Sequence, residues 1–333
     1  MPEFVPRVVE MHAYPIKGAR PGTIDGGEEP TTLLATREGF NLGGVGDREV
    51  FPVDASAEPY VITARGWKSA QGPKVEYRQD AQLAAVLVDV LPGRRLRVDH
   101  FDVGSLEFAL DVTPRAQKLQ SAELVALHGG YVYGVPLPKT TEFASTLLGR
   151  PATFYQALGG LPRTAGGKDH LESRQALAAD GYAYLLTNPK SLEALHAAAE
   201  QRQKPGQEEP DVPMRRYRPN LVVDLGEPFV EHRLRQLKIG DVMFDVPCAC
   251  ARCRMTNINE QGVDVGGGLA LLRPNSGVKM DENGQPGEAG AFFGVNLTTA
   301  NLGPGEERPI SFSSPVQVLE ASDKSNIRLK GEA

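Results

Sequence analysis

Hydrophobic residues occur along the chain as short runs of β-branched and aliphatic side chains, separated by glycine- and proline-rich turns. In the first 100 residues the runs are Val8–Ile16, Leu33–Thr36, Arg48–Val53, Tyr60–Thr63, Ala84–Val88 and Arg95–Val98. Runs this short, at this spacing, are typical of a small antiparallel barrel or sandwich. Pro92-Gly93 separates the last two runs, which we expect to pair as a hairpin.

Two stretches in the second half of the chain predict helices instead of strands. Thr140–Leu148 ends at Gly149, a residue favoured after a helix. Asn188-Pro189 begins the other, because Asn is a good N-cap and Pro suits the first helical position. Its apolar face comprises Leu192, Leu195 and Ala199. Further strands are predicted over Tyr182–Leu186, Leu221–Val223, Val242–Val246, Phe292–Leu297 and Ile310–Leu319.

These elements predict an α+β, β-rich fold with two domains, the number expected for 333 residues. We expect an N-terminal β-barrel domain over 1–125 and a second β-barrel domain over 175–325, joined by a linking segment with a helix over 126–174. Glycine and proline number 36 and 26, well above their usual combined share of about 12%. This excess agrees with many turns and few long helices.

The charge of the chain excludes several classes of partner. A net charge of −6 gives no overall attraction to nucleic acid or to an anionic membrane. No run approaches the roughly 20 apolar residues needed to span a bilayer. The first residues lack the basic and then apolar order of a secretory signal. We therefore expect a cytoplasmic protein in which any anion site is built locally from converging Lys and Arg side chains.

Three cysteines lie within six residues of one another, at Cys248, Cys250 and Cys253, and the chain has no others. An odd number of such close neighbours does not form a disulfide framework, which favours a reducing compartment. Thiolate is a soft ligand suited to zinc, copper(I), iron–sulfur clusters and other thiophilic metals. Arg252 between the last two cysteines favours the ionised sulfur.

Four interpretations of this cysteine segment stay open on the residues alone. Zinc and iron–sulfur sites normally need four protein ligands, more than the segment has. Cys250 and Cys253 have the C-x-x-C spacing of a dithiol switch, but no helix and βαβ context of the thioredoxin type follows. The cysteines also suit buried apolar packing. The last interpretation is a metal held through a single protein thiolate.

Basic residues stand at the ends of several predicted strands: Lys17, Arg48, Arg65 and Arg218. Any one of them alone is most simply a solvated surface charge. Arg binds phosphate with two parallel hydrogen bonds, and Lys binds it as a point charge. If the strand ends converge, these residues form a cradle for an anion.

The chain resembles the MOSC-domain proteins that carry an N-terminal MOSC β-barrel, and in layout the mitochondrial amidoxime-reducing component and its bacterial relatives. The matching motifs are Tyr14-Pro15-Ile16-Lys17, Gly46-Asp47-Arg48, Thr63-Ala64-Arg65, Tyr217-Arg218-Pro219-Asn220, Ile239-Gly240-Asp241 and Cys250-Ala251-Arg252-Cys253. Their order and spacing carry the resemblance, which covers about residues 7 to 320. It implies that the second domain, 175–325, is the MOSC domain.

The resemblance implies a molybdenum cofactor, a molybdenum ion on a pterin dithiolene that bears a phosphate. By position, Cys253 is the metal ligand and catalytic residue. The cofactor-binding residues implied are Lys17, Gly18, Arg48, Arg65, Asn188, Arg218, Asn220, Ala251 and Arg252. At Gly18 and Asn188 relatives commonly have a hydroxyl residue. Since the basic residues come from both domains, we expect the cofactor at their interface, a usual place for small-molecule sites.

The activity implied is that of an oxidoreductase reducing small N-hydroxylated or N-oxide compounds. The sequence has no four-Cys ferredoxin pattern and no G-x-G-x-x-G after a strand, so electrons are expected from a separate reductase. An alternative is a sulfur carrier, or a carrier or binding protein for the molybdenum cofactor, that uses Cys253 or Cys250. The additional Cys248 favours this alternative. A third possibility is a degenerate scaffold that acts as a binding module.

Overall fold

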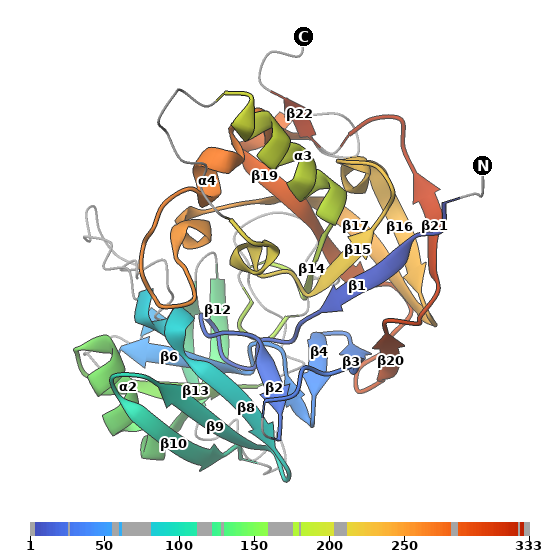
Figure 1. The fold of residues 1–333 in the computed structure, drawn as a ribbon. Helices are drawn as coiled ribbons and strands as arrows, with labels where there is room; N and C mark the ends of the chain where they lie inside the picture. Colours follow the sequence, from blue (N-terminus) through green and yellow to red (C-terminus); the bar gives the residue numbers. More distant parts are fainter. Residues whose placement is uncertain are drawn as a thin grey trace.

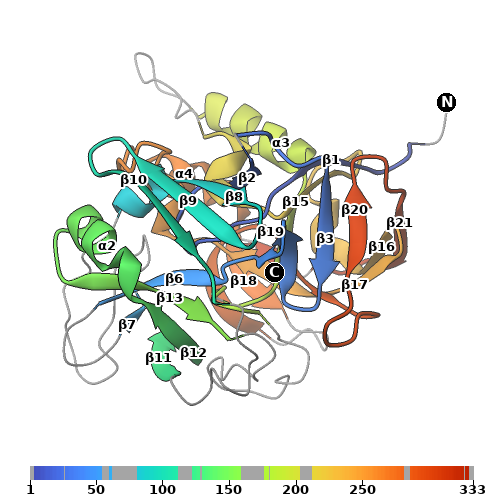
Figure 2. The same ribbon diagram turned by 90° about the horizontal axis from the view of Figure 1, so that it is seen from below.

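The computed structural model is rich in strands and has few helices (Figures 1 and 2). It describes residues 4–25, 27–54, 60–61, 81–111, 122–127, 130–158, 176–179, 181–202, 212–280, 286–325 and 327–329. The strands form two large units, a nine-stranded sheet and a closed barrel, with two smaller sheets beside them. The predicted α+β, β-rich fold class is confirmed.

The nine-stranded sheet joins the first strand of the chain to strands of the second half. Its strands are β1 (Arg7–Met11), β14 (Tyr184–Thr187), β15 (Leu221–Asp224), β16 (Leu234–Ile239), β17 (Val242–Ala251), β18 (Ser276–Met280), β19 (Pro286–Thr299), β21 (Val316–Ala321) and β22 (Ile327–Leu329). Their order is β1-β15-β14-β19-β17-β16-β21, and β18 pairs with both β19 and β22. Only β14 and β15 pair in parallel among these described strands. Figure 1 shows β1 beside β15 at the edge of this sheet.

The closed barrel has five described strands. They are β6 (Val50–Asp54), β7 (Tyr60–Val61), β11 (Glu123–Leu127), β12 (Gly130–Leu137) and β13 (Ala152–Ala157). Strands β12 and β13 lie in the stretch 126–174 for which the sequence predicted only a helix. Gly134 and Pro136 interrupt the apolar pattern of β12. A Cβ atom at Gly134 would come within 2.8 Å of the Phe51 ring, so glycine allows the close approach of these strands.

Two small sheets complete the strands. One contains β2 (Gly22–Ile24), β8 (Leu87–Leu91), β9 (Arg95–His100) and β10 (Gly104–Ala109). The other contains β3 (Thr32–Thr36), β4 (Gly39–Leu42), β5 (Val45–Gly46) and β20 (Arg308–Ser311). The predicted β8–β9 hairpin is confirmed, although β8 begins at Leu87 because residues 81–85 form a 3-10 helix. In Figure 2, β20 lies beside β3, so the two ends of the chain again share a sheet.

Three short helices are α2 (Thr141–Leu148), α3 (Pro189–Glu200) and α4 (Gly268–Leu271). Gly149 ends α2 in the left-handed conformation, as predicted. Asn188 caps α3, and its side-chain oxygen accepts a hydrogen bond from the backbone N–H of Lys190. Helix α4 is a single turn that begins at Gly268. No helix of the described residues has both the length and the apolar character required to cross a bilayer.

One large apolar core runs through both halves of the chain. Tyr184 lies at its centre, with its ring 5.1 Å from that of Phe40 and 5.3 Å from that of Phe244, both in edge-to-face contact. Phe40 belongs to the first 50 residues, whereas Tyr184 and Phe244 belong to the nine-stranded sheet. This packing brings the loops near residues 17 and 48 against the sheet. Domain boundaries at 125 and 175 stay a prediction, and strand pairing and core packing both cross them.

Candidate functional site

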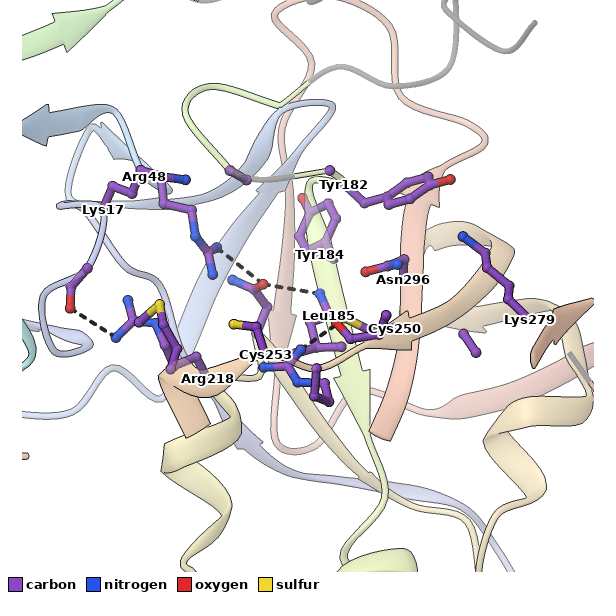
Figure 3. A pocket seen from close by; sticks show the side chains of 18 residues that line it. Lys17, Arg48, Tyr182, Tyr184, Leu185, Arg218, Cys250, Cys253, Lys279 and Asn296 are labelled. Carbon is purple, nitrogen blue, oxygen red and sulfur yellow. Dashed lines mark hydrogen bonds between the residues drawn. The ribbon is translucent and has the colours of Figure 1, made fainter. Parts of the chain in front are cut away.

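A cavity of about 310 Å³ lies where the N-terminal loops meet the nine-stranded sheet (Figure 3). Its described lining includes eight residues that the sequence analysis named: Lys17, Gly18, Arg48, Arg218, Asn220, Ala251, Arg252 and Cys253. Cys250 also lines it. Arg65 was predicted to join them, but it lies outside the described residues. The cavity is large enough for a small-molecule ligand, and segments more than 200 residues apart in the chain form it.

The N-terminal wall is held by backbone contacts. The Lys17 side chain is 5% exposed, and its Nζ donates to the carbonyl of Ala178 at 2.6 Å. The backbone N–H of Lys17 donates to the carbonyl of Val50 at 2.8 Å. Gly18 follows with φ +93°, and a Cβ atom there would come within 3.1 Å of Leu83. The positive φ and the close approach both favour glycine at this position.

Arg48 and Arg218 approach the buried ring of Tyr14. Their guanidinium carbons lie 4.9 Å and 4.4 Å from its centroid, within the range of cation–π interaction. Both arginines have positive φ, 53° and 54°, a conformation that costs a non-glycine residue about 1 kcal/mol or more. Tyr14 Oη donates to the carbonyl of Pro219 at 3.1 Å, and burial raises the pKa of Tyr14 to about 12. Tyr14 therefore positions the two cations and is not itself an acid or base near neutral pH.

Asp47 and Asn220 connect this arrangement to the sheet. Asp47 is 1% exposed, forms an ion pair with Arg48 and accepts hydrogen bonds from the Tyr14 backbone and from Asn220. Asn220 Oδ1 accepts from the backbone of Leu185 at 3.1 Å and from Arg48 at 3.4 Å. Every one of these groups is buried or nearly so, which fixes the orientation of Arg48.

Strand β17 carries Cys248 and Cys250, and Cys253 follows two residues after its end, on the opposite wall of the cavity. Cys248 is buried outside the cavity lining and accepts a hydrogen bond from Asn296 Nδ2 at 3.5 Å. Cys250 and Cys253 line the cavity, and no hydrogen bond to Cys253 Sγ is found within the described part of the chain. A break in the register between β17 and β19 lies beside Cys250, near Gly294 with φ +72°. Such irregularities re-aim side chains next to functional sites.

Arg252 joins the cysteine wall to the loop that carries Arg218. Its Nη1 donates to Cys250 Sγ at 2.9 Å, and its Nη2 donates to the carbonyl of Tyr217 at 2.5 Å. Its Nε is buried without a hydrogen-bond partner from the described residues. Burial alone lowers the pKa of Arg252, but the sulfurs of Cys250 and Cys253 outweigh burial and raise it. Of the two cysteines beside it in sequence, Arg252 therefore hydrogen-bonds Cys250.

The described cavity lining is strongly cationic. Its five basic residues are Lys17, Arg48, Arg218, Arg252 and Lys279, and it includes no Asp or Glu. In the ranges that the structure describes, no three or more His, Cys, Asp or Glu side chains form a group able to hold a metal ion. The arrangement suits an anionic ligand that presents a soft metal to a single thiolate.

Asn188 lies away from this cavity. Its side chain is fully buried, caps α3, and donates to the carbonyl of Glu227 at 2.7 Å and to Glu231 Oε2 at 3.2 Å. All of its hydrogen bonds are made inside the protein, so the structure assigns it a capping role. The sequence analysis correctly identified the helix start, but the direction of the helix is a tertiary property.

Several lining residues were not found from the sequence. Tyr14 and Asp47 do not line the cavity but contact its arginines, and they belong to the same two motifs as Lys17 and Arg48. Tyr182, Lys279 and Asn296 line the cavity without any motif around them. Lys279 and Asn296 come from adjacent strands, β18 and β19, and only the pairing of those strands brings them to the site.

Comparison with known proteins identifies one domain. Residues 173–307 match the model of the MOSC domain. Three relatives are named molybdenum cofactor sulfurase. The one from Drosophila grimshawi is 40% identical over 79 residues, 23% of this chain and 9% of its own length. The human one is 30% identical over 132 residues, which are 37% of this chain and 15% of its own length. That of Arabidopsis thaliana is 49% identical over 49 residues, which are 14% of this chain and 6% of its own length.

The matched segments therefore span only 6% to 15% of the lengths of these relatives. Among solved structures, YiiM from Geobacillus stearothermophilus aligns over 46% of this chain and 71% of its own, with 13% identity and a TM-score of 0.25. The domain assignment depends on the family model and on the curated relatives. Residues 173–307 of this chain are a MOSC domain.

Proposed function

We propose that this protein is a molybdenum-cofactor-dependent oxidoreductase that reduces small N-hydroxylated or N-oxide compounds. The observation that carries the proposal is Cys253 on the wall of a cationic cavity that both halves of the chain build. The MOSC domain and the relatives named molybdenum cofactor sulfurase support the choice of cofactor. The motifs shared with amidoxime-reducing proteins support the choice of reaction.

The residues present fit this cofactor. A phosphate-bearing pterin needs cations without competing carboxylates, which is the composition of the described lining. The buried Nε of Arg252 has no hydrogen-bond partner from the described residues, and an acceptor atom on a ligand would satisfy it. A pterin dithiolene supplies two sulfur ligands, so one protein thiolate completes the set. When bound, the cofactor supplies two-electron redox chemistry that the side chains lack.

Each group of residues has a distinct part in this proposal. Cys253 ligates the metal. The pterin and its phosphate are held by Lys17, Arg48 and Arg218, with Arg65. Because Gly18 and Ala251 are small, the backbone at these positions can approach the ligand closely. Asn220 keeps Arg48 in place through the 3.4 Å hydrogen bond, and Arg252 holds the turn between Cys250 and Cys253. These contacts orient the ligand before the reaction begins.

The reaction balances with two electrons and two protons. An N–OH group gains two electrons and two protons, the N–O bond breaks, and the products are N–H and water. A separate reductase protein supplies the electrons, and water supplies the protons. The protein's contribution is a fixed binding site, since orientation and electrostatic preorganisation are what a protein adds to a reactive cofactor.

The test is molybdenum content and benzamidoxime reduction after expression in a host that makes the cofactor. Wild type should carry stoichiometric molybdenum and reduce benzamidoxime with a reductase and reductant. Cys253→Ser should lose the activity and most of the metal while remaining folded by circular dichroism. Cys248→Ser is the matched control, because Cys248 is buried outside the cavity lining. Metal-free wild type with labile sulfur on Cys250 or Cys253 would instead favour the sulfur-carrier alternative.

A further inference from the structure

The cations of the cavity are divided between two ends. Figure 3 shows Lys17, Arg48 and Arg218 together on one side, and Lys279 alone on the opposite side, beyond Cys250 and Asn296. Three clustered cations suffice for one phosphate, because a phosphate carries no more than two negative charges. Lys279 is therefore a cation in excess of what the proposed cofactor requires.

Lys279 also differs from the other lining cations in its contacts. Lys17 donates to the carbonyl of Ala178, and Arg218 donates to that of Gly18 at 3.4 Å. Arg48 pairs with Asp47. No hydrogen bond or ion pair to the Lys279 side chain is found in the described ranges, although this side chain is half-buried. A partly desolvated ammonium with no acceptor gains most from an anion that arrives with a ligand.

Lys279 lies on a strand that is paired on both sides, with an irregularity in its pairing to β19 between Val278 and Met280. Strand β18 pairs with β19 through Val278 and Ala289, and with β22 through Lys279 and Ile327. The sheet therefore sets the position of the Lys279 Cβ atom, and only the side chain beyond it moves. Asn296, on β19, lines the same part of the cavity and donates its Nδ2 to Cys248, which leaves its Oδ1 as the acceptor available there.

We propose that Lys279 is a specificity residue that binds a carboxylate on the substrate. The inference rests on the proposed function and narrows its substrate class to N-hydroxylated or N-oxide compounds that carry a carboxylate. The cofactor's phosphate belongs at the end with three cations, and the substrate occupies the end with Lys279. Because no acidic side chain is present in the described lining, the carboxylate meets no like charge from it.

The experiment compares benzamidoxime with 4-carboxybenzamidoxime on molybdenum-loaded protein. For wild type, kcat/KM should be about tenfold higher for the carboxylated compound, the order of one hydrogen bond between charged groups. Lys279→Met should lower kcat/KM for the carboxylated compound about tenfold more than for benzamidoxime, through KM, so that the preference is lost. Lys279→Arg should restore most of the preference. Lys238→Met is the control, because Lys238 is half-exposed on β16 and does not line the cavity.

A binding measurement gives a second readout that needs no turnover. Calorimetric titration with 4-carboxybenzamidine and with benzamidine, the two reduced products, isolates the carboxylate, since both carry the same amidinium. The proposal is overturned if Lys279→Met weakens both ligands equally, or if wild type shows no preference for the carboxylated one. Protein that reduces neither amidoxime defeats the proposed function, whereas the ratio of the two binding constants still tests the role of Lys279.

Discussion

Two cavities of similar size differ in how their charges are paired. The cavity with the cysteines has five basic residues and no acidic ones in its described lining. A second cavity, of about 350 Å³, lies near β2 and β8 and has three arginines in its described lining. There, Arg20 pairs with Glu260, Arg97 with Asp89, and Arg215 with Glu29. Volume does not separate the two cavities, whereas the absence of Asp and Glu from the described lining of the first does.

The comparison teaches that an anion site needs a lining in which basic residues outnumber acidic ones. In the second cavity each arginine is neutralised within the protein, so an incoming anion must compete with a carboxylate. In the first, the described lining contains no Asp or Glu, although Asp47 stands behind Arg48. The net positive charge of the first cavity is therefore available to a ligand.

The strongest test of this comparison removes one cation from each cavity. Arg218→Ala should reduce the affinity for the cofactor about 100-fold, because one charge-assisted contact and the packing on Tyr14 are lost. Molybdenum content of the purified protein should fall accordingly. Arg215→Ala, three residues earlier in the chain, should leave the metal content unchanged. Equal losses in the two variants would show that pairing does not distinguish the cavities.

The second test concerns Glu231, an ionisable residue that is buried outside both cavity linings and has no ion pair among the described residues. Glu231 is fully buried, accepts hydrogen bonds from Ser191 at 2.7 Å and Asn188 at 3.2 Å, and burial raises its pKa to about 7. The adjacent His232 is 1% exposed, and burial lowers its pKa to about 4. Burial favours the uncharged form of both side chains, so neither requires a bound ion to balance its charge.

The two shifts have opposite effects on the pH dependence of stability. Between pH 4.5 and 7 the folded protein keeps the Glu231 proton and the unfolded chain releases it, so rising pH lowers the free energy of unfolding. Between pH 4 and 6.5 the unfolded chain binds a proton at His232 and the folded protein does not. Rising pH therefore raises the free energy of unfolding over this range. In wild type the two contributions largely cancel over the shared range.

Substituting either Glu231 or His232 should reveal the pH dependence of stability that the other residue contributes. In Glu231→Gln the free energy of unfolding should rise with pH between 4 and 6.5, by up to about 3 kcal/mol. In His232→Gln it should fall with pH between 4.5 and 7 by a similar amount. Urea unfolding at half-unit pH intervals measures both slopes. Parallel slopes in the two variants and wild type would contradict the assigned protonation states.

A smaller effect is expected at the ring between the two arginines. Tyr14→Phe removes the 3.1 Å hydrogen bond to the carbonyl of Pro219 and keeps the aromatic face. The free energy of unfolding should fall by about 1 kcal/mol, while molybdenum content stays near that of wild type. Tyr14→Leu removes the face as well and should also lower the molybdenum content. If Tyr14→Leu retains full metal content, the ring has no part in positioning Arg48 and Arg218.

The smallest effect concerns the paired cavity itself. Arg215 and Glu29 are largely exposed, with side-chain accessibilities of 42% and 63%. Exposed ion pairs contribute between about 0 and 1 kcal/mol, so Arg215→Ala should shift the urea midpoint only slightly. Added salt should reduce the difference further. A loss of several kcal/mol would mean that this pair, and with it the second cavity, is structurally essential.

Much of the local structure could be predicted from the sequence. The N-cap at Asn188, the helix end at Gly149 and the hairpin over residues 87–100 follow from short-range backbone preferences. The cysteine segment was predicted to follow a strand, and β17 runs directly into it. Strand β12 was missed because Gly134 and Pro136 interrupt its apolar pattern, although the close approach of Phe51 requires the glycine.

The candidate site shows where sequence information ends. The sequence by itself determined many of the local helices and strands and the residue types that they carry. It could do so because hydrophobic periodicity and turn chemistry depend on residues only a few positions apart. Only the tertiary structure decided that β1 pairs with β15, that Lys17 and Cys253 line one cavity, that Lys279 joins them and that Asn188 does not. Contacts between distant segments depend on how whole sheets pair and pack, and no short stretch of sequence encodes that.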